Sequence, residues 1–109
     1  MSQDKSALFH HYWKLLYPAA PVDDPVAEYQ FHATRKWRFD WAFLDAGIAI
    51  EVEGNAWGVK GGGRHMQDKD LEKYNEAAVL GWRVFRFSPS MLKRDPVYCI
   101  EIVKETLYD

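Results

Sequence analysis

Several features that mark particular classes of protein are missing from this sequence. Only one cysteine, Cys99, occurs among the 109 residues, which excludes a disulfide framework and a Cys/His zinc site. Cys99 lies among apolar residues, where we expect a buried structural thiol rather than a nucleophile. No apolar run approaches the roughly 18 residues that predict a membrane span. The first residues also lack the apolar segment of a secretory signal, so we expect a soluble intracellular protein.

Strong charge of either sign is also missing, because the net charge is only −2. Apolar residues make up 48% and aromatic residues 16% of the chain, which predicts a folded protein with a single domain over residues 1–109. The charge is unevenly distributed. Residues 35–94 carry a net charge of +3 and the remainder carries −5. A local positive surface with weak overall attraction to polyanions is therefore expected.

The most regular pattern in the chain covers residues 37–54, WRFDWAFLDAGIAIEVEG. Two apolar runs alternate with period two on either side of Asp45-Ala46-Gly47, which predicts an antiparallel hairpin. An even number of loop residues, such as 44–47, places Ala42 opposite Ala49. One face of the hairpin is then apolar and should pack against a core. That face consists of Trp37, Phe39, Trp41, Phe43, Ile48, Ile50 and Val52.

The other face of this hairpin carries three carboxylates among small alanines. Asp40 is expected directly across from Glu51, with Glu53 on the same side, and cross-strand Cβ atoms lie about 4.5 to 5.5 Å apart. Carboxylates this close repel each other unless a cation lies between them. Mg²⁺ and Mn²⁺ prefer such oxygen ligands, and the alanines are expected to leave space above them. The alternative is that the acids form the solvated face of an ordinary two-sided hairpin.

On the N-terminal side of the hairpin, spacing and composition predict a helix, a loop and a strand. The helix is expected over residues 4–17, capped by Asp4 or Ser6. Its apolar stripe is Leu8, Tyr12, Leu15 and Leu16, widened by Ala7 and Phe9. Residues 18–25 contain three prolines and form a loop. In the short strand that follows, Glu28 either adds a fourth carboxylate to the acidic face or is a surface residue.

On the C-terminal side, the clearest helix covers residues 68–80, with Asp68 or Asp70 as N-cap and Gly81 after its end. Residues 81–89 then read as a strand, and a right-handed crossover makes this strand parallel to one strand of the hairpin. A last helix begins at Asp95-Pro96. The residues expected to face inward are Leu71, Tyr74, Ala78 and Val79 in the first helix and Val97, Ile100, Val103 and Leu107 in the last.

Basic residues gather before and after the hairpin. Arg35, Lys36 and Arg38 precede Asp40, where they either hold a phosphate or balance charge. A second group lies in the glycine-rich segment 55–68 and consists of Trp57, Lys60, Arg64 and His65. This segment lacks the G-x-x-x-x-G-K-[ST] pattern of a nucleotide-binding loop. Its cations suit phosphates and its indole can stack on a base; the alternative is a simple connection with chance charges.

The order of helix, strand, hairpin, helix and strand carries a set of motifs. They are Arg38-Phe39-Asp40, Glu51-Val52-Glu53-Gly54 after ten intervening positions, His65, residues 70–75 and residues 81–87. This pattern covers about two thirds of the chain and resembles the PD-(D/E)XK (restriction-endonuclease-like) nuclease superfamily. It is most similar to the small phage and bacterial branch of very-short-patch-repair endonucleases and compact Holliday junction resolvases. The implied fold is α/β, a mixed four-stranded sheet in the order α-β-β-β-α-β flanked by helices, with an extra C-terminal helix.

The resemblance implies a Mg²⁺-dependent (or Mn²⁺-dependent) endonuclease that hydrolyses phosphodiester bonds of DNA. The implied metal ligands are Asp40, Glu51, the carbonyl of Val52, and Glu53. The superfamily usually has a lysine at the position that Glu53 occupies here. Glu53 is therefore expected to hold a second metal or a metal-bound water, and Lys73 of the following helix to replace the lysine. His65 is expected to act as a general acid toward the leaving oxygen.

The resemblance also implies partners and a setting. DNA is the expected partner, and branched or nicked DNA in phage recombination or repair is the expected substrate. One metal site cuts one strand, so cutting both would require a homodimer. We expect the protein in the cytoplasm of a bacterium, encoded by the host or by a phage. The competing interpretations are a catalytically silent DNA- or protein-binding module of the same fold, and a small regulatory protein whose acidic face docks a basic partner.

Overall fold

The structure, a computed structural model, describes residues 5–19, 24–53 and 68–108. Its elements are α1 (Ala7–Leu16), β1 (Val26–Gln30), β2 (Arg38–Phe43), β3 (Ile48–Val52), α2 (Asp68–Val79), β4 (Arg83–Phe87), α3 (Pro89–Arg94) and α4 (Pro96–Leu107). The predicted α/β fold is confirmed in its element order, and the short helix α3 is an addition. In the described ranges, every helix is too short or too polar to cross a membrane.

The four strands form one mixed sheet in the order β1-β2-β3-β4. β1 and β2 are antiparallel, as are β2 and β3, and β4 runs parallel to β3. Ala42 pairs with Ala49, so the predicted hairpin register is confirmed. The predicted crossover through α2 is also confirmed. It places Arg86 of β4 beside Glu51 of β3, a pairing that becomes important at the site.

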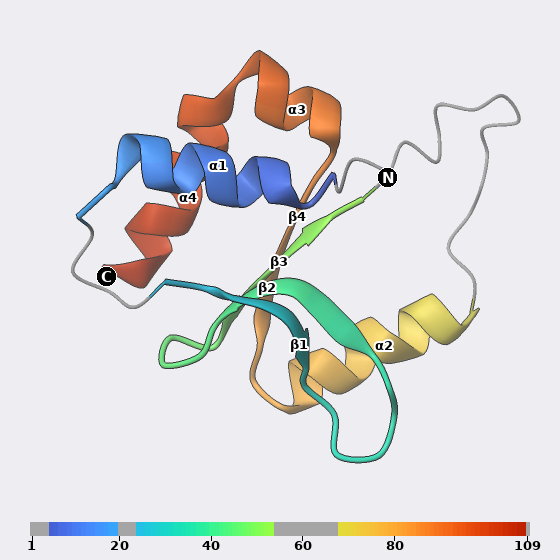
Figure 1. Ribbon diagram of the computed structural model, residues 1–109. Helices are drawn as coiled ribbons and strands as arrows, with labels where there is room; N and C mark the ends of the chain where they lie inside the picture. The colour runs from blue at the N-terminus through green and yellow to red at the C-terminus, as the bar shows by residue number, and fades with distance from the viewer. Residues whose placement is uncertain (1–4, 20–23, 54–67, 109) are drawn as a thin grey trace, which may run out of the picture.

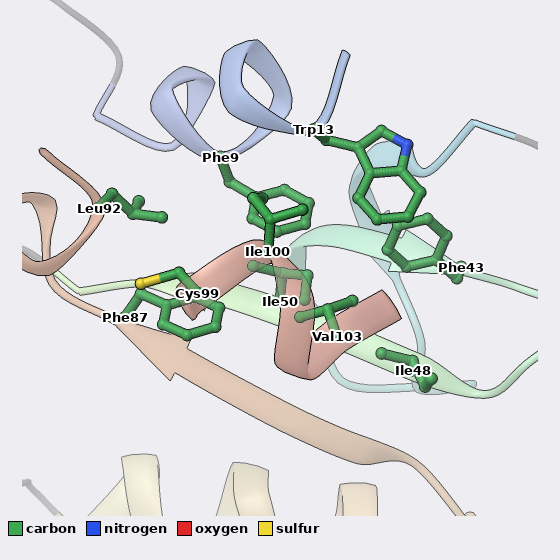
Figure 2. Close-up of a cluster of buried hydrophobic side chains, with 10 residues drawn as sticks. All are labelled: Phe9, Trp13, Phe43, Ile48, Ile50, Phe87, Leu92, Cys99, Ile100 and Val103. Atoms are coloured by element: carbon green, nitrogen blue, oxygen red, sulfur yellow. The ribbon is translucent and has the colours of Figure 1, made fainter. Parts of the chain in front are cut away.

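Helices cover both faces of this sheet, with α2 on one side and α1, α3 and α4 on the other (Figure 1). The larger core lies on the three-helix side, where aromatic and aliphatic side chains from the sheet meet the helices (Figure 2). It consists of Phe9, Trp13, Phe43, Ile48, Ile50, Phe87, Leu92, Cys99, Ile100 and Val103. Cys99 is fully buried there, which confirms its prediction as a buried thiol.

The buried residues of α1 differ from the predicted stripe. Phe9 and Trp13 are the buried pair, whereas Leu15 is 62% exposed and Leu16 is 37% exposed. A spacing of four residues puts Phe9 and Trp13 on one face, and both rings pack on Phe43. The largest rings therefore define the buried face. Ser6 occupies the N-cap position as predicted, but its side chain makes no capping hydrogen bond.

The C-terminal helices begin at side-chain caps, and a hydrogen bond adds to the packing of α4 near α1. Asp95 caps α4 by accepting from the backbone N–H of Tyr98 at 3.3 Å, as the Asp-Pro pair predicts. Ile100 and Val103 face inward as expected, but Val97 is 54% exposed. The Tyr17 hydroxyl, just after α1, donates to Glu101 of α4 at 2.5 Å.

A smaller core lies between the sheet and α2. Ala42, Ala49 and Ala77 are all fully buried there. The expectation that the hairpin alanines leave open space was therefore wrong: their small side chains allow α2 to approach the sheet, and Ala77 fills the room. The apolar stripe predicted for α2 was also wrong, since Leu71 is 47% exposed and Val79 is 79% exposed.

The first two strands change face near Asp40. Phe39 packs with Phe31 in the smaller core, with ring centroids 4.1 Å apart, whereas Trp41 packs against the larger core. The prediction that Trp37 and Phe39 share the face of Trp41 and Phe43 was wrong for this reason. Residues two apart on a regular strand share a face, so β2 departs from regular pleating between Phe39 and Trp41, and each covered face of the sheet receives a large apolar side chain.

The change of face coincides with an irregular residue on the edge strand. The pairs Ala27 with Trp41 and Tyr29 with Phe39 place Glu28 at the level of Asp40. Glu28 has a φ of 52°, the left-handed region that a residue with a side chain seldom adopts. Backbone strain in such regions costs on the order of 1 to 3 kcal/mol and often accompanies functional sites.

Candidate active site

Asp40 lies where the backbone ladder between β2 and β3 ends. The last pair of that ladder is Trp41 with Ile50. One step further on, Asp40 Oδ2 accepts a hydrogen bond from the backbone N–H of Val52 at 2.7 Å. The Asp40 carboxylate thus accepts from the Val52 N–H in place of the backbone carbonyl that would accept if the ladder continued. This contact fixes Asp40 at the end of β3, next to Glu51.

Glu51 is the most buried carboxylate that the described chain presents in this region. Its side chain is 11% exposed and lies on the α2 side of β3. Lys73 of α2 donates to both of its oxygens, at 3.2 and 3.3 Å. The hydroxyl of Tyr74, the next residue of α2, donates to Oε1 at 3.0 Å. Three donated contacts therefore hold this carboxylate in one orientation.

The electrostatics of Glu51 reflect both its burial and its neighbours. Burial raises the pKa of Glu51, and the negative charge of Asp40 raises it further, whereas the charge of Lys73 and the hydrogen bonds of Tyr74 and Lys73 act in the opposite direction. Asp40 accepts from the backbone N–H of Val52, the residue after Glu51, which brings the two carboxylates to the same end of β3. Burial, and then the charge of Glu51, raises the pKa of the Tyr74 hydroxyl, which stays protonated as the donor.

Glu53 lies at the end of β3 and pairs with a cation from β4. Its backbone N–H donates to the carbonyl of Phe87 at 2.8 Å. Its carboxylate accepts from Arg86 Nε at 2.8 Å. Arg86 in turn lies over the ring of Tyr74, with Cζ 4.6 Å from the ring centroid. Glu53 is therefore linked to Glu51 through Arg86 and Tyr74.

The two acids nearest each other form a donor set that suits a magnesium ion. Mg²⁺ is often held by one or two carboxylates, with water and substrate phosphates completing its octahedron. Asp40 and Glu51 supply two such carboxylates on adjacent strands. In residues 5–19, 24–53 and 68–108, no group of three His, Cys, Asp or Glu side chains is arranged to hold a metal. Two carboxylates alone would hold such an ion only together with oxygens from water and substrate phosphates.

Of the basic residues predicted to bind DNA, Arg35 and Lys36 lie on the connection between β1 and β2, and Arg38 is the first residue of β2. Arg35 pairs with Glu72 of α2 at 3.2 Å and lies over the Trp37 ring, with Cζ 4.0 Å from its centroid. Lys36 and Arg38 are exposed beside it. Helix α2 contacts both regions: Glu72 pairs with Arg35 of this connection, and the next residue, Lys73, pairs with the buried acid Glu51.

His32 organises that connection. Its Nδ1 accepts from the backbone N–H groups of Thr34 and Arg35, at 3.2 and 3.0 Å. Its Nε2 lies 3.3 Å from Glu76 Oε1, one turn along α2 from Glu72. An imidazole nitrogen that accepts carries no proton, so the proton of the neutral ring is on Nε2, facing Glu76.

Of the remaining predicted site residues, one lies on the edge strand of the sheet and the others lie outside the described ranges. Glu28 is exposed on the edge strand β1, at the level of Asp40. The predicted general acid His65 and the predicted DNA-binding residues Trp57, Lys60 and Arg64 lie outside the described residues.

Two members of this cluster are absent from the sequence-based set, namely Tyr74 and Arg86. Tyr74 was assigned to an apolar stripe; consecutive helix residues point about 100° apart, so its place next to Lys73 gave no signal that both side chains reach Glu51. The sequence alone does not place Arg86 at the site, because its neighbours are known only once β4 is paired in parallel with β3. In the sequence, the alternation of Arg86 with Phe85 and Phe87 indicated only that its side chain points to the opposite face of the sheet from theirs.

Comparison with solved structures bears on the fold. The chain is similar to the catalytic domain of the homing endonuclease I-Bth0305I, with a TM-score of 0.62 and 19% identity over 94% of this chain and 93% of that one. The chain therefore shares the fold of that domain. No family model matches the sequence, and no curated protein matches it.

Proposed function

We propose that the chain is a metal-dependent endonuclease that hydrolyses phosphodiester bonds of DNA. One observation carries this proposal: the buried carboxylate of Glu51 lies beside Asp40 from the neighbouring strand, and Lys73 Nζ is 3.2 Å from it. Two acids and one lysine are the groups that the PD-(D/E)XK pattern, which this sequence resembles, uses for metal-assisted phosphodiester hydrolysis. The likeness to a homing endonuclease catalytic domain gives this constellation a suitable scaffold.

Each residue of the constellation has a role that follows from its position. Asp40, Glu51 and the carbonyl of Val52 would hold Mg²⁺ or Mn²⁺. The ion, when bound, would supply Lewis-acid stabilisation of phosphate charge and a lower pKa for an attacking water. Lys73 would orient the nucleophile and offset negative charge, which is the task of the lysine that the PD-(D/E)XK pattern has where this chain has Glu53. Tyr74 would keep Glu51 in its orientation through the hydroxyl contact.

DNA is the proposed substrate because cations flank these acids. Arg35, Lys36 and Arg38 would contact backbone phosphates ahead of Asp40. Branched or nicked DNA in phage recombination or repair remains the proposed substrate class, together with a role for His65 as general acid. Cutting both strands of a duplex would require a second copy of the chain, so a homodimer is proposed for that reaction.

A second candidate is a DNA- or protein-binding module without catalysis. It is favoured by the contacts of the acids, since Glu51 is held by Lys73 and Tyr74, and Glu53 is held by Arg86. In this interpretation the ion pairs are structural and no metal is required. The two candidates predict different responses to metal and to loss of Asp40.

The deciding experiment is incubation of the purified protein with supercoiled plasmid and with synthetic four-way and nicked DNA, in Mg²⁺, Mn²⁺ or EDTA. Cleavage should require the metal and should fall by at least about a hundredfold in Asp40→Asn. Asp45→Asn is the matched control, because Asp45 is an exposed acid in the turn of the same hairpin. DNA binding without cleavage under any metal condition would select the silent module.

A further inference from the structure

A row of planar side chains leads from the smaller core out to the connection between β1 and β2. Phe39 is fully buried and stacks on Phe31, with ring centroids 4.1 Å apart and planes inclined by 5°. Phe31 in turn stacks on Trp37 at a centroid distance of 6.2 Å. The guanidinium of Arg35 lies over the Trp37 ring, with Cζ 4.0 Å from the centroid. The row therefore ends at a planar cation whose side chain is 47% exposed.

The position of Arg35 is fixed by hydrogen bonds from its backbone and its side chain. Its N–H donates to Nδ1 of His32 at 3.0 Å, and its carbonyl accepts from Nε2 of Gln30 at 3.1 Å. Its Nη2 atom donates to Glu72 of α2 at 3.2 Å. An exposed arginine normally loses side-chain freedom when it binds a ligand, and these contacts remove part of that cost beforehand. Arg35 is therefore oriented before a partner arrives.

These contacts leave a particular part of the guanidinium exposed. The group is planar, with N–H donors along its edges and two flat faces. One face lies on the indole of Trp37, and one edge donates to Glu72. Because 47% of the side chain stays exposed with both contacts made, that area belongs to the opposite face and the remaining edges. Phosphate binds along an edge of a guanidinium, whereas a flat aromatic group binds on its face.

A base of DNA can occupy such a face only when it has left the base stack. In an intact duplex each base lies between two others, and pulling one out is costly. At a branch point, or at a nick with a displaced end, a base is unpaired and its flat surface is accessible. Unstacked bases of nucleic acids bind on aromatic rings and on arginine planes. The exposed face of Arg35 therefore suits branched or nicked DNA better than an intact duplex.

The place of Arg35 relative to the candidate active site agrees with this role. The connection between β1 and β2 extends beyond the strands, beside α2 (Figure 1). Glu72 of α2 holds the guanidinium, and the next residue of that helix, Lys73, donates to Glu51. A base held at Arg35 would thus be positioned by the helix that carries the proposed catalytic lysine.

We propose that the guanidinium of Arg35, supported by Trp37, stacks on an unpaired base of branched or nicked DNA, and that Glu72 is its positioning residue. This inference rests on the proposed nuclease function and deepens it, because it names the feature of the DNA that the protein recognises. The edge donors of Arg35 keep the phosphate contact proposed above. The face adds a contact that depends on the structure of the DNA.

The test compares the affinities of the protein for two DNAs without metal, by fluorescence anisotropy in EDTA. One DNA is an intact duplex, and the other is the same duplex with one extra, unpaired adenine at a nick. The parent should bind the second DNA about five- to tenfold more tightly, as expected for one stacked base. A parent that binds both DNAs equally would overturn the proposal.

Arg35→Lys separates stacking from charge, because lysine keeps the positive charge and loses the plane. It should bind the intact duplex within about twofold of the parent and show no preference for the unpaired base. Lys36→Gln is the matched control: this exposed neighbour should weaken binding of both DNAs to the same degree and leave the preference unchanged. A parental preference in Arg35→Lys would mean that Arg35 acts through charge alone, and the stacking contact would fail.

Changes in the DNA test the contact without any effect on protein folding. An abasic site in place of the unpaired adenine should lower the affinity of the parent to that for the intact duplex. 2-Aminopurine at the same place loses fluorescence when it stacks, so its signal should fall on binding to the parent and change little with Arg35→Lys. Equal affinities of the parent for the abasic and the adenine DNA would contradict stacking.

The role of Glu72 is tested by the ratio of the two affinities. Glu72→Ala removes a negative charge and should raise the affinity for both DNAs, and this effect cancels in the ratio. The preference for the unpaired base should fall in the parent background and should not change further in the Arg35→Lys background. An unchanged preference in Glu72→Ala would show that Glu72 does not orient Arg35. Thermal unfolding of each variant is recorded in parallel.

Two further outcomes separate this inference from the proposed function. If the parent prefers the unpaired base, Arg35→Lys loses that preference and no metal supports cleavage, the nuclease proposal fails and the stacking contact stands. If the parent cleaves DNA with metal and Arg35→Lys keeps the parental preference, the stacking contact fails alone.

Discussion

Lys73 donates to both carboxylate oxygens of Glu51, at 3.2 and 3.3 Å, across the interface between α2 and β3. The two residues are 22 positions apart in the sequence. The contact forms because Ala77, one turn further along α2, packs on Ala42 and Ala49 and brings the helix close to the sheet. Packing of three alanines thus decides whether a lysine reaches the buried acid.

Removal of the lysine charge should abolish most cleavage. Lys73→Met keeps an unbranched side chain against Phe39 and Tyr74 but loses the cation, and we expect cleavage to fall at least about a hundredfold. Lys73→Arg should retain part of the activity because it keeps the charge. Lys93→Met, at an exposed position of α3, is the control and should cleave like the parent. A Lys73→Met protein with parental cleavage rates would exclude Lys73 from the reaction.

The raised pKa of Glu51 predicts a specific pH dependence of stability. Because the folded state binds this proton more tightly than the unfolded state, the Glu51 contribution is favourable at low pH and is lost as pH rises from about 4.5 through the raised pKa. Each unit of elevation corresponds to about 1.4 kcal/mol. Glu51→Gln removes this loss, so the free energy of unfolding of the variant relative to the parent should increase from pH 4 to pH 8.

Urea unfolding at several pH values measures the difference in the free energy of unfolding between the variant and the parent. Groups that titrate alike in both proteins cancel in this difference. Gln keeps one acceptor oxygen and replaces the other, which Lys73 also contacts, with an amide NH₂ group. The effect of the lost acceptor does not itself titrate, so the change of the difference with pH reports the Glu51 charge. A constant difference between the two proteins across that range would contradict a raised pKa for Glu51.

The close approach of α2 to the sheet can be tested by adding volume at a single position. Ala77→Leu places a larger side chain against Ala42 and Ala49, and overpacking of this kind costs about 1 to 3 kcal/mol. Cleavage should fall as well, because the helix that carries Lys73 must move. Ala78→Leu is the matched control: the same change one residue later lies on the exposed side of α2 and should leave stability and cleavage near parental values. Thermal unfolding and plasmid cleavage distinguish the two.

His32 is expected to hold the basic connection through its Nδ1 atom. Asn Oδ1 occupies nearly the same place as Nδ1, so His32→Asn should retain the contacts to the backbone of Thr34 and Arg35. His32→Gln preserves a polar group near Glu76 but loses that acceptor, and it should be about 1 to 2 kcal/mol less stable than His32→Asn. It should also bind DNA more weakly, as Arg35 and Lys36 lose their fixed position. Anisotropy and urea unfolding check both effects, and identical behaviour of the two variants would exclude the Nδ1 role.

The sequence determined the features that depend on local pattern and short connections. Alternation around Asp45-Ala46-Gly47 predicted the register of Ala42 with Ala49, and the helix after it predicted a parallel fourth strand. The proline and aspartate before α4 predicted its start. These features follow from backbone periodicity and turn chemistry, which neighbouring residues specify without help from the rest of the chain.

Only the tertiary structure decided which side chains meet. Phe39 and Trp41 lie two residues apart yet pack in different cores, because helices cover both faces of the sheet and the strand changes face at Asp40. Leu71 and Val79 are exposed, while Lys73 and Tyr74 of the same helix turn toward Glu51. Burial of a carboxylate, and the cations that make it tolerable, depend on which helix covers which strand. That choice is made by packing over the whole domain, so it cannot be read from the residues on either side of Glu51.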